Sequence, residues 1–123
     1  MIQQGYAKGP QALVVLNVCR DPLLREERAK TLHDAGYYTS AAQNPEEAIQ
    51  LASQMNFAIA VVCHSLSASE RNSVREWMQE KAPGTTVVLL GKSSDDNPEL
   101  LLAAVRAAVL SRGTSHAAIL QVN

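Results

Sequence analysis

An unbroken apolar run, Phe57-Ala-Ile-Ala-Val-Val, ends abruptly in Cys63 and His64 and is bounded by polar residues on both sides. A run this short is typical of a β-strand that is covered on both faces. Strands buried on both faces characterise the parallel sheets of α/β proteins. Ligands of such sheets bind beyond the carboxyl ends of the strands. The sequence therefore places Cys63 and His64 at the edge of the sheet where an α/β protein carries its functional site.

The composition is that of a globular protein. Of the 123 residues, 46% are hydrophobic and 19% are charged, which is enough apolar material for one buried core. Eleven basic and twelve acidic residues leave a net charge of −1, so bulk charge favours neither nucleic acid nor a membrane as a partner. The chain has no apolar run of ~20 residues, as a membrane span needs, and no signal-peptide core. Two cysteines are too few for a secreted disulfide scaffold, so we expect a cytoplasmic location.

Strands and helices are predicted to alternate along the chain. Residues 1–11 lack periodicity and are expected to form a flexible arm before a single domain over residues 12–123. Strands are predicted at 12–19, 37–42, 57–63 and 85–91, and helices at 21–36, 44–55, 67–81 and 97–113. Asp21, Asn44 and either Ser67 or Ser69 are expected to cap the first three helices. The alternation predicts a parallel sheet with right-handed crossovers. Asn17, inside the first strand, should have a hydrogen-bond partner.

The last predicted helix is apolar on every side. Between Leu100 and Leu110 the only charged residue is Arg106. A helix of this kind should be buried on more than one side, but in so small a domain the sheet covers only one. Either the tail at 117–122 folds over the helix or another subunit does.

The order and spacing of several stretches resemble the CheY-like receiver domain of two-component response regulators. Among them are Val18-Cys-Arg-Asp-Pro-Leu-Leu-Arg25, His33-Asp-Ala-Gly-Tyr37 and Ala41-Ala-Gln-Asn-Pro-Glu-Glu-Ala48. The other matching segments are 57–67, 83–90 and 97–101. The resemblance covers residues 12–110 and implies an α/β, flavodoxin-like parallel sheet. It should have four or five strands in the order 2-1-3-4(-5), flanked by helices.

The positions that carry the chemistry of this family hold other residues here. The resemblance implies that Cys63 replaces the phosphate-accepting aspartate, and that Cys19 and Arg20 replace the acidic pair that holds magnesium. Gly91 replaces the hydroxyl residue that ends strand four. The Lys-Pro pair that follows strand five in the family has no counterpart, because Lys92 follows strand four.

Physical chemistry makes these replacements decisive. Phosphoryl transfer needs a divalent cation and cationic groups around the phosphoryl oxygens. Magnesium binds through carboxylate oxygens, and thiols and guanidinium groups are poor ligands for it. Asp21 is retained but belongs to the helix cap, while Arg20 is expected to place a fixed cation in the vacated pocket.

We therefore expect a degenerate, non-phosphorylatable receiver-like domain that is not an enzyme. It should act in a two-component-type pathway by binding a protein partner or by dimerising, without a metal ion or another cofactor. The degenerate pocket comprises Cys19, Arg20, Asp21, Cys63, His64, Gly91 and Lys92.

The C-terminal part allows two arrangements. In the favoured one, residues 98–112 are the fourth helix, 117–122 form the fifth strand and the fifth helix is missing. In the other, residues 97–101 begin the final helix of the family, and the fourth helix and fifth strand are deleted. Either arrangement exposes apolar surface that a full receiver would cover, so we expect a homodimer through this helix. The expected dimer surface comprises Leu100, Leu101, Val105 and Val109.

The cysteines suggest two further functions. If strands one and three are neighbours, Cys19 and Cys63 end adjacent strands and lie within reach of a disulfide. That arrangement predicts a thiol redox sensor as the alternative function. A hydrolase with Cys63 as nucleophile and His64 as base is a weaker hypothesis, because adjacent strand residues point to opposite faces. Unreactive buried thiols are the simpler interpretation of both patterns.

The sequence favours neither of two conceivable metal sites. Cys19, Cys63 and His64 lack a fourth ligand and a metal-type spacing. Asp95 and Asp96 are interpreted as solvated loop residues before the Asn97 helix cap.

Overall fold

The computed structural model describes residues 13–92 and 97–110 and the backbone of the strand at 119–122. The predicted N-terminal arm and the Asp95-Asp96 pair lie outside these residues. Among the helices of the described part, none is long and apolar enough to cross a membrane.

Five parallel strands form one sheet. They are β1 (Val14–Val18), β2 (Tyr38–Ala42), β3 (Ile59–Val62), β4 (Thr86–Leu90) and β5 (Ile119–Val122), in the order β2-β1-β3-β4-β5. The predicted flavodoxin-like order is therefore confirmed. All four residues of β3 are buried, because β3 lies in the middle of the sheet and both of its faces are covered. Its unbroken apolar sequence is the consequence.

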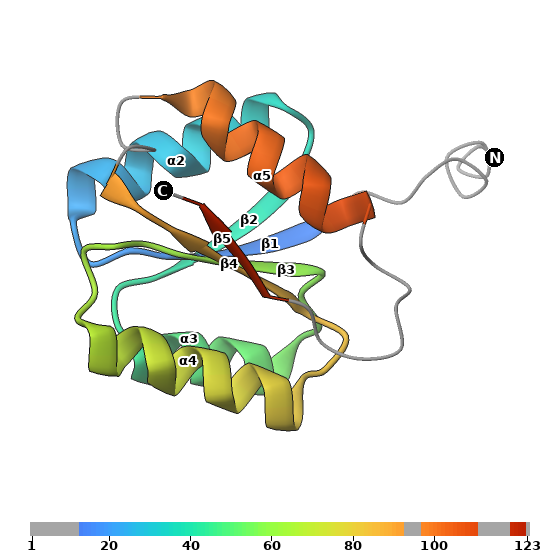
Figure 1. Ribbon diagram of the computed structural model, residues 1–123. Coiled ribbons are helices and arrows are strands. Elements are labelled where there is room, and N and C mark those ends of the chain that lie inside the picture. The colour runs from blue at the N-terminus through green and yellow to red at the C-terminus, as the bar shows by residue number, and fades with distance from the viewer. Residues whose placement is uncertain (1–12, 93–96, 111–118, 123) are drawn as a thin grey trace, which may run out of the picture.

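Helices cover both faces of the sheet (Figure 1). They are α2 (Pro22–Asp34), α3 (Pro45–Gln54), α4 (Ala68–Lys81) and α5 (Pro98–Leu110). α2 and α5 lie on one face, and α3 and α4 lie on the other. Each face has its own core, because alternate strand residues point in opposite directions. Leu16 and Val62 of the strands pack in the core with Met78 of α4, and Val61 and Val88 pack in the core with Leu101 of α5.

Side chains cap the starts of the first three helices, as expected. The carboxylate of Asp21 accepts hydrogen bonds from the backbone N–H groups of Leu23 and Leu24. The Asn44 side chain accepts one from Glu47 N. For α4 the structure selects Ser67, whose hydroxyl accepts from Glu70 N while the Glu70 carboxylate accepts from Ser67 N.

We expect Ser67→Ala to lower the free energy of unfolding by about 1 kcal/mol, because it removes an N-cap acceptor from α4. Ser69→Ala, an exposed position in the first turn of the same helix, is the matched control and should change stability by less than about 0.5 kcal/mol. Urea denaturation of both variants checks this. Equal losses in the two variants would show that the capping box contributes nothing specific.

The connection from β4 to β5 differs in hand from the three before it. β2 lies on one side of β1, whereas β5 lies beyond β4 on the opposite side of the sheet. α2 and α5 nevertheless cover the same face (Figure 1). The crossovers through α2, α3 and α4 are right-handed, as expected, and the crossover through α5 is left-handed. Parallel crossovers are right-handed in nearly all proteins, so this last unit is an exception to the rule that the first three crossovers follow.

The C-terminal part combines features of the two expected arrangements. β5 pairs with β4, Val88 lying opposite Leu120, as the favoured arrangement requires. A right-handed fourth helix would lie beside α4, whereas α5 lies beside α2 and contacts it. β5 therefore occupies the position of a fifth strand. α5, however, covers the face of the sheet opposite to the one that a fourth helix would cover.

The expected dimer surface on this helix is partly wrong. Leu101 and Val105 are buried in the core beneath α5, because the helix turns these two side chains toward the sheet. Leu100 and Val109 are half-buried. The outward side of α5 is still mostly apolar, and its exposed residues after the first turn are Ala103, Arg106, Ala107 and Leu110.

Candidate functional site at the carboxyl ends of β1 and β3

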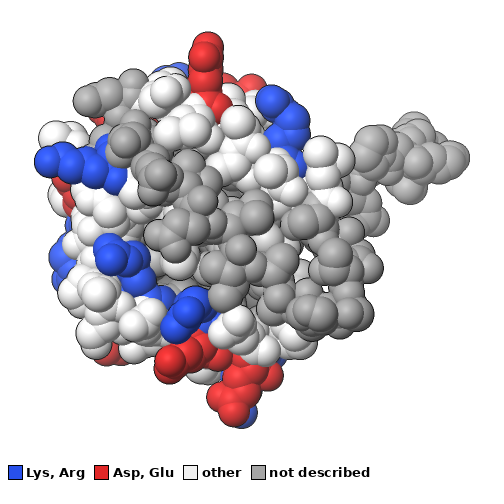
Figure 2. Space-filling model, viewed as in Figure 1, with Lys and Arg blue, Asp and Glu red and all other residues white. Residues whose placement is uncertain are grey.

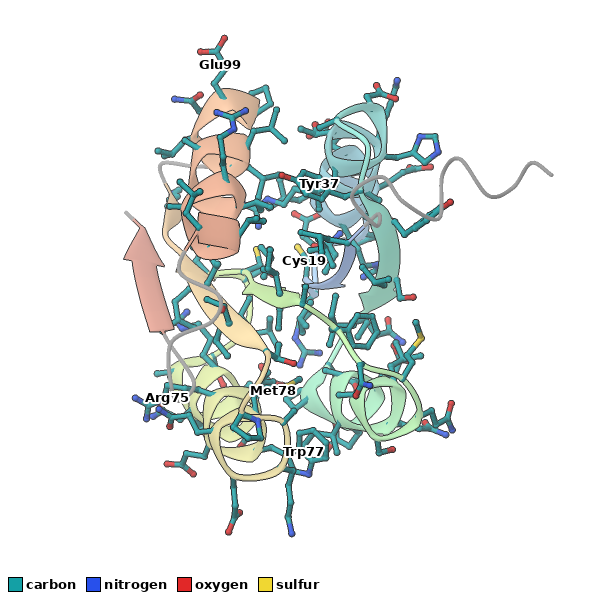
Figure 3. All side chains as sticks on the ribbon, turned by 90° about the vertical axis from the view of Figure 1, so that its right-hand side faces the viewer. Cys19, Tyr37, Arg75, Trp77, Met78 and Glu99 are labelled. Atoms are coloured by element: carbon teal, nitrogen blue, oxygen red, sulfur yellow. The ribbon has the colours of Figure 1, made fainter. Side chains whose placement is uncertain are left out.

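Two buried cysteines meet where β1 and β3 end. The strands are parallel neighbours with Val18 opposite Val62, so Cys19 and Cys63 follow directly as the next pair. Both are free cysteines with no exposed surface. Figure 3 shows Cys19 near the centre of the molecule, between the two helical layers. The sequence prediction that these two residues end adjacent strands is confirmed.

Ser65, in the loop after β3, contacts both thiols. Its backbone N–H donates a hydrogen bond to Cys63 Sγ at 3.4 Å, and its Oγ lies 3.6 Å from Cys19 Sγ. The same hydroxyl accepts a hydrogen bond from Arg20 N at 3.0 Å. Cys19 Sγ also lies 3.6 Å from the carbonyl oxygen of Asp21, to which the thiol can donate. Two thiols and one hydroxyl therefore form the centre of the site.

The two thiols differ in acidity because they share a hydrogen bond. The Cys19 thiol donates to Cys63, and this lowers the pKa of Cys63 below that of an ordinary thiol. Ser65 and the charge of Arg28 act in the same direction, while burial acts against them. The same hydrogen bond, together with burial, raises the pKa of Cys19. The pair therefore gives up one proton readily, from Cys63, and holds the second one tightly on Cys19.

The fixed cation near the thiols comes from Arg28, not from Arg20. We expected the Arg20 side chain in the pocket, but it is half-exposed and forms an ion pair with Glu70 of α4. Arg20 follows the strand end, and its side chain points outward to the start of α4. Arg28 is almost completely buried, and its charge favours both thiolates. The sequence contains a signal for this residue, because Leu24, Arg28 and Leu32 recur at the spacing of one buried helix stripe.

Two other arginines hold the loops around the site, and we did not predict either from the sequence. Arg71 Nη1 donates to the carbonyl oxygens of His64 at 3.2 Å and Leu66 at 2.9 Å. Arg25 Nη1 donates to the carbonyl oxygen of Cys19 at 2.8 Å. Asn17 has the partner we expected, because its side-chain amide donates to the carbonyl oxygen of Arg25 at 3.0 Å.

The remaining predicted site residues surround the thiols less closely. Asp21 is exposed and acts as the cap of α2, so its carboxylate is used by the helix. His64 is half-buried, and the pKa of Cys63 is shifted by Cys19, by burial, and to a smaller degree by Ser65 and Arg28. Gly91 and Lys92 follow β4, and Lys92 is exposed. A cysteine–histidine catalytic pair therefore has no support in the contacts of Cys63 that the structure gives.

The chemical character of this edge is basic more than acidic. In Figure 2, several Lys and Arg side chains lie on the left of the molecule. The carboxyl ends of the strands lie on the same side in Figure 1. Within residues 13–92 and 97–110, no group of three or more His, Cys, Asp or Glu side chains is placed to hold a metal ion.

A cavity of about 540 Å³ lies at the opposite edge of the sheet, at the amino ends of β1, β3 and β4. Its lining includes Phe57, Ala58, Lys81 and Thr85. The Thr85 hydroxyl donates to the carbonyl oxygen of Phe57 at 2.7 Å, so this polar group is already used within the fold. The cavity brings together no set of reactive side chains.

Solved structures show what this arrangement of strands and helices is similar to. The receiver domain of an HD domain-containing protein from Pseudomonas fluorescens Pf-5 superposes with a TM-score of 0.70 at 16% identity, over 81% of this chain and 96% of that one. The fold is that of a CheY-like receiver domain. Chemotaxis response regulator CheY4 of Vibrio cholerae gives a TM-score of 0.66 at 21% identity, over 80% of this chain and 99% of that one.

A third receiver structure was solved with bound ligands. Response regulator TrrA from Thermotoga maritima, solved in complex with Mg²⁺ and beryllofluoride, gives a TM-score of 0.60 at 21% identity. The match covers 90% of this chain and 86% of TrrA. No protein-family model matches the chain, and no curated protein matches it in sequence. At these identities the comparisons show a shared fold alone.

Proposed function

We propose that this chain is a receiver-like signalling domain that cannot be phosphorylated and acts by binding a protein partner in a two-component-type pathway. The observation that carries the proposal is the centre of the site. The receiver fold is present, but the end of β3 carries a buried thiol, Cys63, packed against Cys19 and Ser65. A binding module of this kind uses the receiver surface without the phosphoryl switch.

The lost chemistry concerns both the acceptor and the metal. Aspartyl phosphorylation needs a carboxylate at the end of β3, and the described site offers a thiol there. Magnesium needs hard oxygen ligands, whereas the residues after β1 are Cys19 and Arg20. The next residue, Asp21, uses its carboxylate to cap α2. The charge of the buried Arg28 lowers the pKa of both thiols and would further oppose the entry of a divalent metal ion.

The test is to mix the full chain with magnesium and either acetyl phosphate or beryllofluoride. We expect no phosphate incorporation by intact mass, and no change in the fluorescence of Trp77, the single tryptophan. TrrA, whose solved structure holds Mg²⁺ and beryllofluoride, is the positive control in the same buffer. A stoichiometric, acid-stable and base-labile phosphate on this chain would disprove the proposal.

We further propose a homodimer that forms through the outward side of α5. Leu110 is 80% exposed and follows the exposed Ala103 and Ala107 along that side. The hand of the last crossover supports a second copy as the occupant. If β5 came from the partner, it would fill the same place beside β4 without the disfavoured left-handed connection.

Ala107→Glu tests this interface, because it places a charge in the middle of the apolar side of α5. We expect light scattering to show a dimer for the wild-type chain and a monomer for Ala107→Glu. Gln79→Glu, an exposed position on α4, adds a negative charge away from α5 and should remain dimeric. A wild-type chain that stays monomeric at high concentration would rule out the dimer without affecting the phosphorylation test.

A further inference from the structure

We infer that Cys19 and Cys63 form a reversible oxidation site, at which a small peroxide converts the two thiols into a disulfide between the ends of β1 and β3. The inference concerns the covalent chemistry of the chain itself. It stands or falls independently of the partner and dimer proposals above.

The backbone geometry suits a disulfide. Parallel neighbouring strands lie about 4.8 Å apart, and disulfides join residues whose Cα atoms are roughly 4.4–6.8 Å apart. Cys63 N donates to the carbonyl oxygen of Val18 at 3.0 Å, so the strand pairing continues up to the cysteines. The two side chains also share a hydrogen bond. Both sulfur atoms also contact Ser65, so bond formation needs the approach of two side chains that the same residue already holds.

The surroundings of the sulfurs favour the reactive form. The thiolate, not the thiol, attacks peroxides and disulfides. The Ser65 N–H donates to Cys63 Sγ, the Cys19 thiol acts on Cys63 in the same direction, and the buried charge of Arg28 favours both thiolates. These donors and this charge lower the pKa of Cys63. An unreactive pair of core thiols would lack them, because a purely apolar environment raises a thiol pKa.

Because both sulfur atoms are buried, only a small oxidant can reach them. Neither cysteine has exposed surface, so a bulky disulfide or alkylating reagent cannot reach the sulfurs in the folded chain. Hydrogen peroxide is only slightly larger than a water molecule and is uncharged. We therefore name a small peroxide as the oxidant, and a dithiol reductant as the agent that restores the thiols after the disulfide becomes accessible.

The reaction balances with one peroxide. The Cys63 thiolate attacks one peroxide oxygen, the O–O bond breaks, and the released hydroxide takes up a proton, which leaves a sulfenic acid and one water. Cys19 sulfur then attacks Cys63 sulfur, the S–S bond forms and the S–O bond breaks. The departing hydroxide takes the Cys19 proton and becomes the second water. Two thiols are oxidised by two electrons, and the peroxide is reduced to two waters.

The loops that flank the site would respond to this change. Ser65 links the thiols to Arg20 N, and Arg20 pairs with Glu70 in the capping box of α4. Disulfide formation removes the Cys19 thiol proton and also the Cys63 thiolate, which accepts a hydrogen bond from Ser65 N–H. The redox state would therefore be transmitted to the surface at the start of α4.

The primary test uses the reduced full chain and hydrogen peroxide. The reaction is stopped, the protein is unfolded and alkylated, and its mass and peptides are measured. We expect the loss of two hydrogen atoms, one peptide pair linked through Cys19 and Cys63, and full recovery of both thiols with dithiothreitol. The folded chain should form the disulfide at least about tenfold faster than the chain unfolded in urea, because only folding supplies the paired thiolate.

Substitutions at three residues test which side chains take part in disulfide formation. Cys19→Ser should leave Cys63 as a sulfenic acid, because no second sulfur resolves it, and dimedone present while the chain is unfolded should trap that acid. Ser65→Ala keeps the backbone N–H but removes the hydroxyl that contacts Cys19 Sγ and helps to lower the pKa of Cys63, so it should slow disulfide formation about threefold to tenfold. Ser69→Ala, an exposed serine of α4, should react at the wild-type rate. Two thiols that stay free under peroxide that oxidises the unfolded chain would overturn the inference. So would oxidation to sulfinic acid alone, or disulfides formed only between molecules.

Discussion

Leu101→Ala is expected to lower the free energy of unfolding by about 2–5 kcal/mol, the usual cost of emptying a leucine site in a core. Leu101 is 1% exposed and packs beneath α5 with Val61 and Val88. Alanine would leave a cavity between the helix and the sheet, since the backbone of a paired strand cannot collapse into it. Chemical denaturation followed by far-ultraviolet circular dichroism measures the change.

Leu110→Ala is the matched control on the same helix. Leu110 is 80% exposed, so its truncation removes little buried area and should change the stability of the monomer by less than about 0.5 kcal/mol. Measured at concentrations where the chain is monomeric, the two variants separate the inner and outer sides of α5. Equal losses would mean that α5 does not pack on the sheet as described.

Arg71→Leu is expected to cost about 2–3 kcal/mol, because charge-assisted hydrogen bonds contribute more than neutral ones and their loss leaves carbonyl groups without donors. Arg71 Nη1 donates to the carbonyl oxygens of both His64 and Leu66. These two residues flank Ser65, so the guanidinium holds the loop that brings Ser65 to the thiols. The variant should also oxidise at Cys63 more slowly than the wild-type chain.

Arg75→Leu provides the control for Arg71→Leu. Arg75 lies one turn further along α4, and its ion pair with Glu76 spans 4.0 Å with the Glu76 side chain 72% exposed. Exposed pairs of this kind contribute about 0–1 kcal/mol, so its stability and its oxidation rate should remain close to those of the wild-type chain. A loss of stability as large as that of Arg71→Leu would refute the role assigned to the loop contacts.

The sheet could be predicted because its signals are local. The apolar run before Cys63 is long enough for one buried strand, and Asp21 and Asn44 mark helix starts by residue type and spacing. The alternation of strands and helices predicted the parallel sheet. The resemblance to receivers predicted the strand order that makes β1 and β3 neighbours. The contact between Cys19 and Cys63 was thus foreseeable, at the level of strand ends.

The groups that tune the site could not be foreseen in the same way. Ser65 and Arg71 act through hydrogen bonds across a loop, and no periodicity marks such contacts. Arg20 and Arg28 are identical in chemistry, yet the first pairs with Glu70 at the surface and the second is buried beside the thiols. Whether Arg28 enters the core depends on the rotation of α2 against the sheet, and that rotation is a property of the packed structure.

For this protein the sequence by itself determined the elements, their parallel pairing and the absence of carboxylates at the ends of β1 and β3, because residue type and short-range spacing encode these features. Only the tertiary structure decided which side of α5 is buried, why its crossover is left-handed and how two thiols, Ser65 and Arg28 meet. A helix that is apolar all round has no preferred side of its own. Packing against neighbouring elements, and not the residues of α5 alone, determines which side of this helix is buried.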